Sequence, residues 1–272
     1  WALFWENPVG RLGLFLLVMN DRQRGPLSDP GGNRWLAMLR RGLRPFGPRN
    51  FWKSLWQLRP LTGLLIVVAI AGPWYVLVGL RTDGLWLEKF FGDHNLMRAL
   101  QPRENHSGSI FYYVVAVLVG FFPWSVLIGP ALVELIDRIR RDERSRDACI
   151  FLALWSGWVI VFWSLLSTKL PHYVLPAYPA LALMTALFID GWVTEPARYS
   201  RWWMRNATVT FVVVGVALAV ALPIVASIYL PGEEILGAVG AVLIVGGAWA
   251  LFHVERLETH RAIAVFTATS VV

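Results

Sequence analysis

Long apolar runs separated by short polar segments dominate the pattern of this 272-residue sequence. Several runs hold about 20 residues without charge, which is the length that an α-helix needs to cross a bilayer. Seven segments and the start of an eighth lie at about 1–19, 61–80, 110–133, 148–166, 173–192, 207–230, 235–254 and 262–272. Backbone N–H and C=O groups find no water in lipid, so each run is expected to be helical. The pattern predicts an all-α fold, a polytopic transmembrane helix bundle in which residues 1–272 form a single transmembrane domain.

Two further segments predict short interfacial helices that lie on the membrane surface. Residues 50–58 and 85–91 each gather aromatic and leucine side chains on one helical face, with polar residues elsewhere. Such an apolar face is typical of helices that lie in the plane of the membrane. An ordinary amphipathic helix packed on the bundle is an equally good interpretation of either segment.

Composition narrows the class of protein. The chain is 56% hydrophobic and only 16% charged, whereas a soluble domain carries about 25% charged residues. Its single cysteine, Cys149, has no partner for an internal disulfide. A soluble enzyme, a disordered tail and a secreted disulfide-rich scaffold are therefore excluded.

The basic residues orient the predicted spans. Nineteen of the 25 Lys and Arg residues lie in alternate polar segments, at 20–60, 134–147, 195–206 and 253–261. Cytoplasmic loops of membrane proteins are the ones rich in Lys and Arg, so these segments are predicted to face the cytoplasm. The net charge of +7 follows from this bias. We expect these basic segments to contact membrane lipids and not nucleic acid.

Polar residues of the opposite, outer side form a first candidate cluster in the string FFGDHNLMRAL. If this string is helical, His94 and Arg98 are four residues apart and share a face, with Asp93 beside them. Arg98 offers a planar guanidinium that suits a phosphate. A hydrogen-bonded loop histidine is the better interpretation of His94 taken alone.

The string STKLPHYVLPAYP forms a second candidate cluster between two spans. Its prolines, among them Pro171 and Pro176, prevent a regular helix through the turn. A broken helix at membrane depth occurs where it is buried in protein or lines a wet cavity. Lys169 in such a turn suits a phosphate as a point charge, although a lysine near a span end also reaches the interface by extending along it. A hydrogen-bonded loop histidine is the better interpretation of His172 taken alone, and an aromatic residue of the membrane interface is an alternative interpretation of Tyr173.

Histidines and carboxylates near one interface can hold a divalent metal ion, but no tight ligand spacing such as HExxH occurs. Walker, GxSxG and Rossmann glycine motifs are also absent from the sequence. A transporter or flippase for a lipid or small anion is the alternative function. It would need charged residues inside the spans, whereas here the polar clusters gather at one face.

Two strings, in this order, resemble one family. KLPHYVLPAYPALALM, and FFGDHNLMRAL followed by FYYVVAVLVGFFPWSVLIGP, resemble bacterial membrane glycosyltransferases. These are related to dolichyl-phosphate-mannose protein mannosyltransferases and to the aminoarabinose transferases that modify lipid A. The resemblance covers residues 61–192 well, and beyond Thr194 the sequence is generic apolar helix.

The resemblance implies a multi-pass glycosyltransferase of the C-type fold in the bacterial inner membrane, with its active side facing the periplasm. Such an enzyme moves a hexosyl or pentosyl group, with inversion, from a polyprenyl-phosphate donor to a lipid or protein acceptor. By the resemblance, Arg98 and Lys169 hold the donor phosphate, Tyr173 and His172 lie at the donor pocket, and His94 is a metal ligand.

The sequence departs from the family pattern at its start. The family's catalytic acid lies in a loop after the first span, and the region that carries it has no counterpart here, so no catalytic residue is assigned. Glu6 stands where the family has a lysine. We therefore expect the chain to be a fragment that lacks the N-terminal part.

Overall fold

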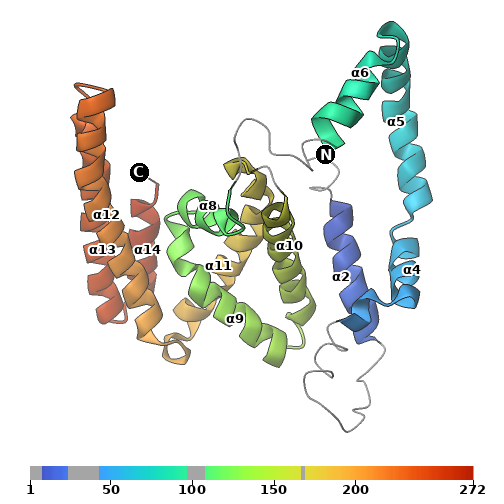
Figure 1. Cartoon of the computed structure of the whole chain (residues 1–272). Coiled ribbons are helices and arrows are strands. Elements are labelled where there is room, and N and C mark those ends of the chain that lie inside the picture. Colours follow the sequence, from blue (N-terminus) through green and yellow to red (C-terminus); the bar gives the residue numbers. More distant parts are fainter. Residues whose placement is uncertain (1–7, 24–42, 97–107, 167–168, 272) are drawn as a thin grey trace. The chain divides into compact units, whose positions relative to one another are not determined.

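The computed structural model describes residues 8–23, 43–96, 108–166 and 169–271 (Figure 1). Within these ranges the regular structure is helical throughout and contains no β-strand. This confirms the predicted all-α fold class. It also agrees with the physical requirement that a segment in lipid satisfies its own backbone hydrogen bonds.

Five helical segments of the described chain are long and apolar enough to cross a membrane. They are α5 (Pro60–Arg81), α10 (Arg146–Leu165), the η4–α11 pair (Pro171–Thr194), α12 (Arg201–Tyr229) and the segment Ile235–Glu255, which contains α13 (Ala238–Glu255). Each overlaps a range expected from the apolar pattern. Helix α5 shows how the apolar pattern locates a span, because Arg59 and Arg81 flank a run without any charged residue.

The helical span expected at 110–133 is broken and bent in the structure. Helix α8 (Tyr112–Gly120) is followed by the 3-10 helix η3 (Trp124–Leu127) and α9 (Ile128–Arg141), and the helical path bends by 113° between the two arms. Pro123 at the break has no backbone N–H to donate to a continuous helix. Helix α9 is also amphipathic rather than uniformly apolar, with Glu134 and Leu135 buried and Val133 and Ile136 exposed.

Near the N-terminus, α2 (Pro8–Arg22) packs against α4 (Pro48–Gln57) through polar side chains. The amide of Asn20 donates to Ser54 Oγ at 2.9 Å, and that of Asn50 donates to the Leu17 carbonyl at 2.7 Å. The polar face of α4 is thus the buried one, while its aromatic face, with Trp56 69% exposed, is open. This inverted pattern agrees with the expected interfacial helix at 50–58.

The segment expected to be helical at 85–91 forms α6 (Leu85–Glu88) and the start of the π-helix η2 (Lys89–Leu96). Its aromatic side chains pack on α5. Phe91 stacks on Tyr75 at a centroid distance of 5.8 Å, and Trp86 packs edge-to-face against Trp74 at a centroid distance of 5.0 Å. The aromatic face therefore packs partly on the neighbouring helix, as the second interpretation of this segment requires.

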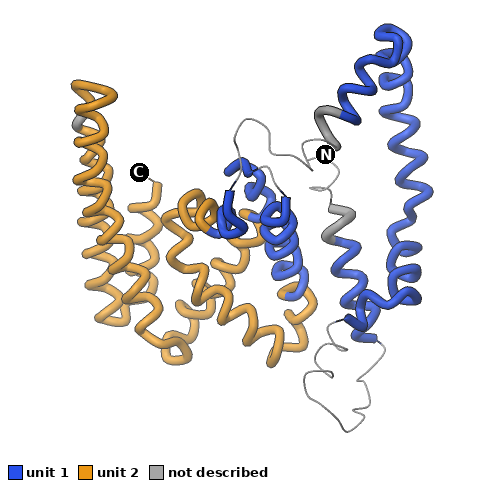
Figure 2. Tube along the Cα trace, in the orientation of Figure 1, with its two compact units in different colours: residues 1–114, 150–177 blue, residues 115–149, 178–272 orange. Residues whose placement is uncertain are grey.

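The chain divides into two compact units (Figure 2). Unit 1 comprises residues 1–114 and 150–177, and unit 2 comprises residues 115–149 and 178–272. In unit 2, α12 lies along α13, and α13 packs on α14 (Thr259–Thr269). A β-carbon at Gly240 would collide with the backbone of Ala219 and the carbonyl of Gly215, so the two long helices approach each other through their backbones.

Candidate functional site

The turn that follows α10 brings together three residues predicted to belong to the site: Lys169, His172 and Tyr173. Lys169 lies before η4 (Pro171–Ala177), and its side chain is only 4% exposed. His172 lies at the surface of the same turn. Its ring packs at a steep angle against the ring of Tyr173, with the two ring centroids 4.7 Å apart. These three side chains lie within unit 1.

The ammonium group of Lys169 caps the C-terminal end of α10. Its Nζ donates to the carbonyl oxygens of Trp163 at 3.2 Å and Ser164 at 2.6 Å. Carbonyls of the last turn have no partner within the helix, and that end carries partial negative charge, so a cation is stabilised there. Burial lowers the pKa of Lys169 below its usual value.

Aromatic side chains hold this turn in place. Tyr113 is fully buried, its hydroxyl accepts the Leu170 N–H at 3.1 Å, and Lys169 Nζ lies 5.4 Å from its ring centroid. Tyr173 stacks on Trp163 with ring centroids 4.0 Å apart. The cation, the broken helix and the aromatic rings thus form one packed cluster, which we call the lysine turn.

This geometry limits what Lys169 offers to a ligand. An ammonium group has three N–H donors, and the two carbonyl bonds leave one for an anion. The sequence predicts that Lys169 binds a phosphate, and this contact stays a prediction. The structure shows that the ammonium group is held by the helix whose end it caps.

The other predicted site residues fall outside the described structure. Arg98 lies in the undescribed range 97–107, and the side chain of His94 also lies outside the described part. No group of three or more His, Cys, Asp and Glu side chains suited to a metal ion occurs among the described residues. The predicted phosphate contact of Arg98 and metal contact of His94 therefore remain predictions.

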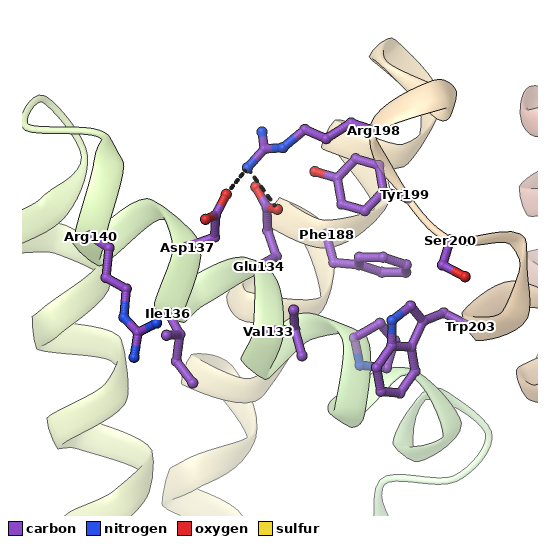
Figure 3. A pocket seen from close by; sticks show the side chains of 11 residues that line it. Val133, Glu134, Ile136, Asp137, Arg140, Phe188, Arg198, Tyr199, Ser200 and Trp203 are labelled. Carbon is purple, nitrogen blue, oxygen red and sulfur yellow. Dashed lines mark hydrogen bonds and ion pairs between the residues drawn. The ribbon is translucent and has the colours of Figure 1, made fainter.

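A second polar cluster occurs in unit 2, where α9 meets η5 (Pro196–Arg198) (Figure 3). Arg198 Nη2 donates to Asp137 at 2.6 Å and lies 3.3 Å from Glu134. Glu134, whose side chain is 2% exposed, also pairs with Arg138 at 2.6 Å, and Asp137 pairs with Arg141 at 2.7 Å. Two carboxylates thus share three arginines.

A pocket of about 410 Å³ opens beside this ion-pair network, and we call it the α9 pocket. Its polar wall includes Arg140, Arg198 and Tyr199, and its apolar wall includes Val133 and Trp203. Burial, with the neighbouring Glu134 carboxylate, raises the pKa of Tyr199 to about 12. The Asp137 carboxylate raises the pKa of Arg198 above its already high value.

Sequence reasoning missed the α9 pocket because it treated 134–147 and 195–206 only as loops that set orientation. The spacing contained part of the information, since Glu134 and Arg138, and Asp137 and Arg141, are four residues apart on a helix. No short sequence spacing links Arg198 to Glu134 or Asp137, because Asp137 lies 61 residues before Arg198 in the sequence.

Comparison with known proteins identifies relatives of the chain, although no protein-family profile matches it. The chain is 30% identical over 219 residues to an undecaprenyl phosphate-alpha-4-amino-4-deoxy-L-arabinose arabinosyl transferase of Pectobacterium carotovorum. A transferase of the same name from Edwardsiella ictaluri is 28% identical over 206 residues. The matches cover 77% and 74% of this chain but 37% and 36% of the relatives. The chain thus spans little more than a third of their length.

A solved structure supports the same relationship at the level of fold. It is the crystal structure of ArnT from Cupriavidus metallidurans bound to undecaprenyl phosphate, with a TM-score of 0.57 and 24% identity. The match covers 86% of this chain and 41% of that one. Over about three quarters of its own length the chain is therefore similar in sequence to bacterial aminoarabinose arabinosyl transferases, as the two sequence strings predicted.

Proposed function

We propose that this protein is an integral-membrane glycosyltransferase. It takes a sugar from a polyprenyl-phosphate donor and passes it to a lipid acceptor on the extracytoplasmic face, with inversion. The relatives are named as arabinosyl transferases with an undecaprenyl-phosphate donor, so 4-amino-4-deoxy-arabinose, a pentose, is the sugar that we propose. This kinship favours transfer over the alternative of a transporter or flippase.

The structural feature that carries the proposal is the lysine turn. A buried cation, Lys169, lies in a proline-broken segment between two apolar spans. By the charge distribution of the loops, that segment faces the outside. A cation placed there stabilises the negative charge that grows on a lipid-phosphate leaving group.

In the proposed reaction an acceptor oxygen attacks the anomeric carbon of the sugar while the bond from that carbon to the phosphate oxygen breaks. The electron pair of that bond leaves with the polyprenyl phosphate, and one displacement inverts the anomeric configuration. We propose that Arg98 and Lys169 bind the phosphate, and that Tyr173 and His172 line the donor pocket. A divalent ion held by His94 belongs to the same proposal.

The test is transfer of labelled sugar from the undecaprenyl-phosphate donor to lipid A by the full-length protein in detergent. Arg98→Ala and Lys169→Ala should abolish transfer at normal expression, whereas Lys53→Ala, an exposed lysine on α4, should transfer normally. Because Lys169 also caps α10, the transfer rates of the wild type and of Lys169→Ala are compared at a temperature at which both stay folded. Full transfer by both site variants would refute the phosphate assignment.

A further inference from the structure

The α9 pocket lies within unit 2, and none of its lining residues has a part in the proposed transfer. It is bordered by the end of α9, the end of α11 (Tyr178–Thr194) and the start of α12. We propose that it binds the phosphate headgroup of an anionic glycerophospholipid from the cytoplasmic leaflet of the membrane.

Two arginines line the pocket: Arg198 lies beside the two carboxylates, and Arg140 lies apart from it, next to Ile136 (Figure 3). Arg198 uses one nitrogen, Nη2, for both Glu134 and Asp137. A guanidinium has five N–H donors, so Nε and Nη1 still offer three to a ligand, and the two carboxylates hold the group in one orientation. Arg140 lines the same pocket with an exposed side chain, and it enters none of the ion pairs among the described residues. A phosphate suits the planar donor group of either arginine.

The apolar end of the pocket suits the chains of a lipid. Val133, Ile136 and Arg140 are three and four residues apart, so they follow one face of α9 from an apolar to a cationic end. Val133 is 52% exposed and Ile136 is 46% exposed. A molecule whose acyl chains contact Val133 and Ile136 places its headgroup at Arg140, with Trp203 on the opposite wall (Figure 3).

The position of the pocket in the membrane favours a lipid over a soluble phosphate. Its elements end in the segments that are rich in Lys and Arg, which marks the cytoplasmic side. Anionic lipids of that leaflet accumulate beside basic segments, and basic pockets between transmembrane helices on that side recognise their headgroups. A free phosphate would leave the apolar wall of the pocket unused.

Native mass spectrometry of the full-length protein in detergent tests this proposal. Phosphatidylglycerol and phosphatidylethanolamine of equal chain length are titrated separately. Phosphatidylglycerol should bind more tightly, and Arg140→Gln should raise its Kd about tenfold, because one charge-assisted contact is lost. Arg144→Gln, at an exposed arginine in the turn that follows α9 and outside the pocket lining, should leave the Kd unchanged.

Arg198→Lys provides a second variant that keeps the charge beside Glu134 and Asp137 while removing the planar fork, and it should also weaken binding. Equal binding of the two lipids, or equal loss in Arg140→Gln and Arg144→Gln, would overturn the proposal. Inorganic phosphate at the concentration of the lipid should not displace it. Displacement would identify a site for free phosphate and would also overturn the proposal.

Discussion

Replacement of Lys169 by methionine isolates the contribution of the ammonium group to the lysine turn. Methionine keeps most of the unbranched apolar stem and removes the two hydrogen bonds to the carbonyls of Trp163 and Ser164. A hydrogen bond to a charged group contributes about 1.5 kcal/mol or more. The cost of burying the ammonium, which also lowers the pKa of Lys169, offsets part of this gain. We expect a net loss of about 2 kcal/mol in the free energy of unfolding.

For a protein of this size such a loss lowers Tm by about 4–8 °C. Thermal unfolding followed by intrinsic tryptophan fluorescence measures it, with Lys53→Met as the matched control because Lys53 is exposed on α4. The folded pKa lies below the unfolded value, so the unfolded state binds more protons between the two values. The free energy of unfolding of the wild type therefore rises with pH between these two pKa values, which lie at and below the ordinary lysine pKa. Methionine does not titrate, so the difference in this free energy between the wild type and Lys169→Met grows over the same pH range. A Tm equal to that of wild type at all pH values would refute the capping role.

Three further substitutions test the packing of unit 2. Gly240→Val should destabilise the protein by about 1–3 kcal/mol through overpacking, because its side chain would meet the α12 backbone at Ala219; unchanged thermal unfolding would contradict this close approach. Gly191→Ala should displace Tyr199, whose hydroxyl occupies the space that a β-carbon would fill. It should therefore shift the tyrosine titration down from about pH 12, as followed by absorbance. Glu134→Gln should cost about 1–2 kcal/mol, because a buried carboxylate shared by two partly exposed arginines is lost; a more stable variant would show that the network is not stabilising.

The long helices were predictable because hydrophobicity acts on each residue separately. The run that forms α5 contains no charge between Arg59 and Arg81, so its length alone indicates a span. The bend between α8 and α9 was not predicted, since a count of apolar residues gives the length of a segment but not its direction. Pro123 marked the position without specifying the 113° angle.

The site was predictable only as a set of residue types close together in sequence. The turn containing Lys169, His172 and Tyr173 was identified because prolines interrupt an apolar region there. That Lys169 folds back onto the end of α10 depends on the three-dimensional path of the turn. The α9 pocket depends even more on tertiary structure, because Arg198 reaches Asp137 across 61 residues of sequence.

Transfer of a sugar from a polyprenyl-phosphate donor can be measured directly. Purified full-length protein is incubated in detergent with lipid A and undecaprenyl-phosphate donor labelled in the sugar, and the label in each lipid is quantified over time. We predict that label moves to the acceptor with inverted anomeric configuration and that unlabelled undecaprenyl phosphate accumulates in equal amount. The proposed transfer would be refuted if the label stayed on the donor and if liposomes that contain the protein carried intact donor across the bilayer.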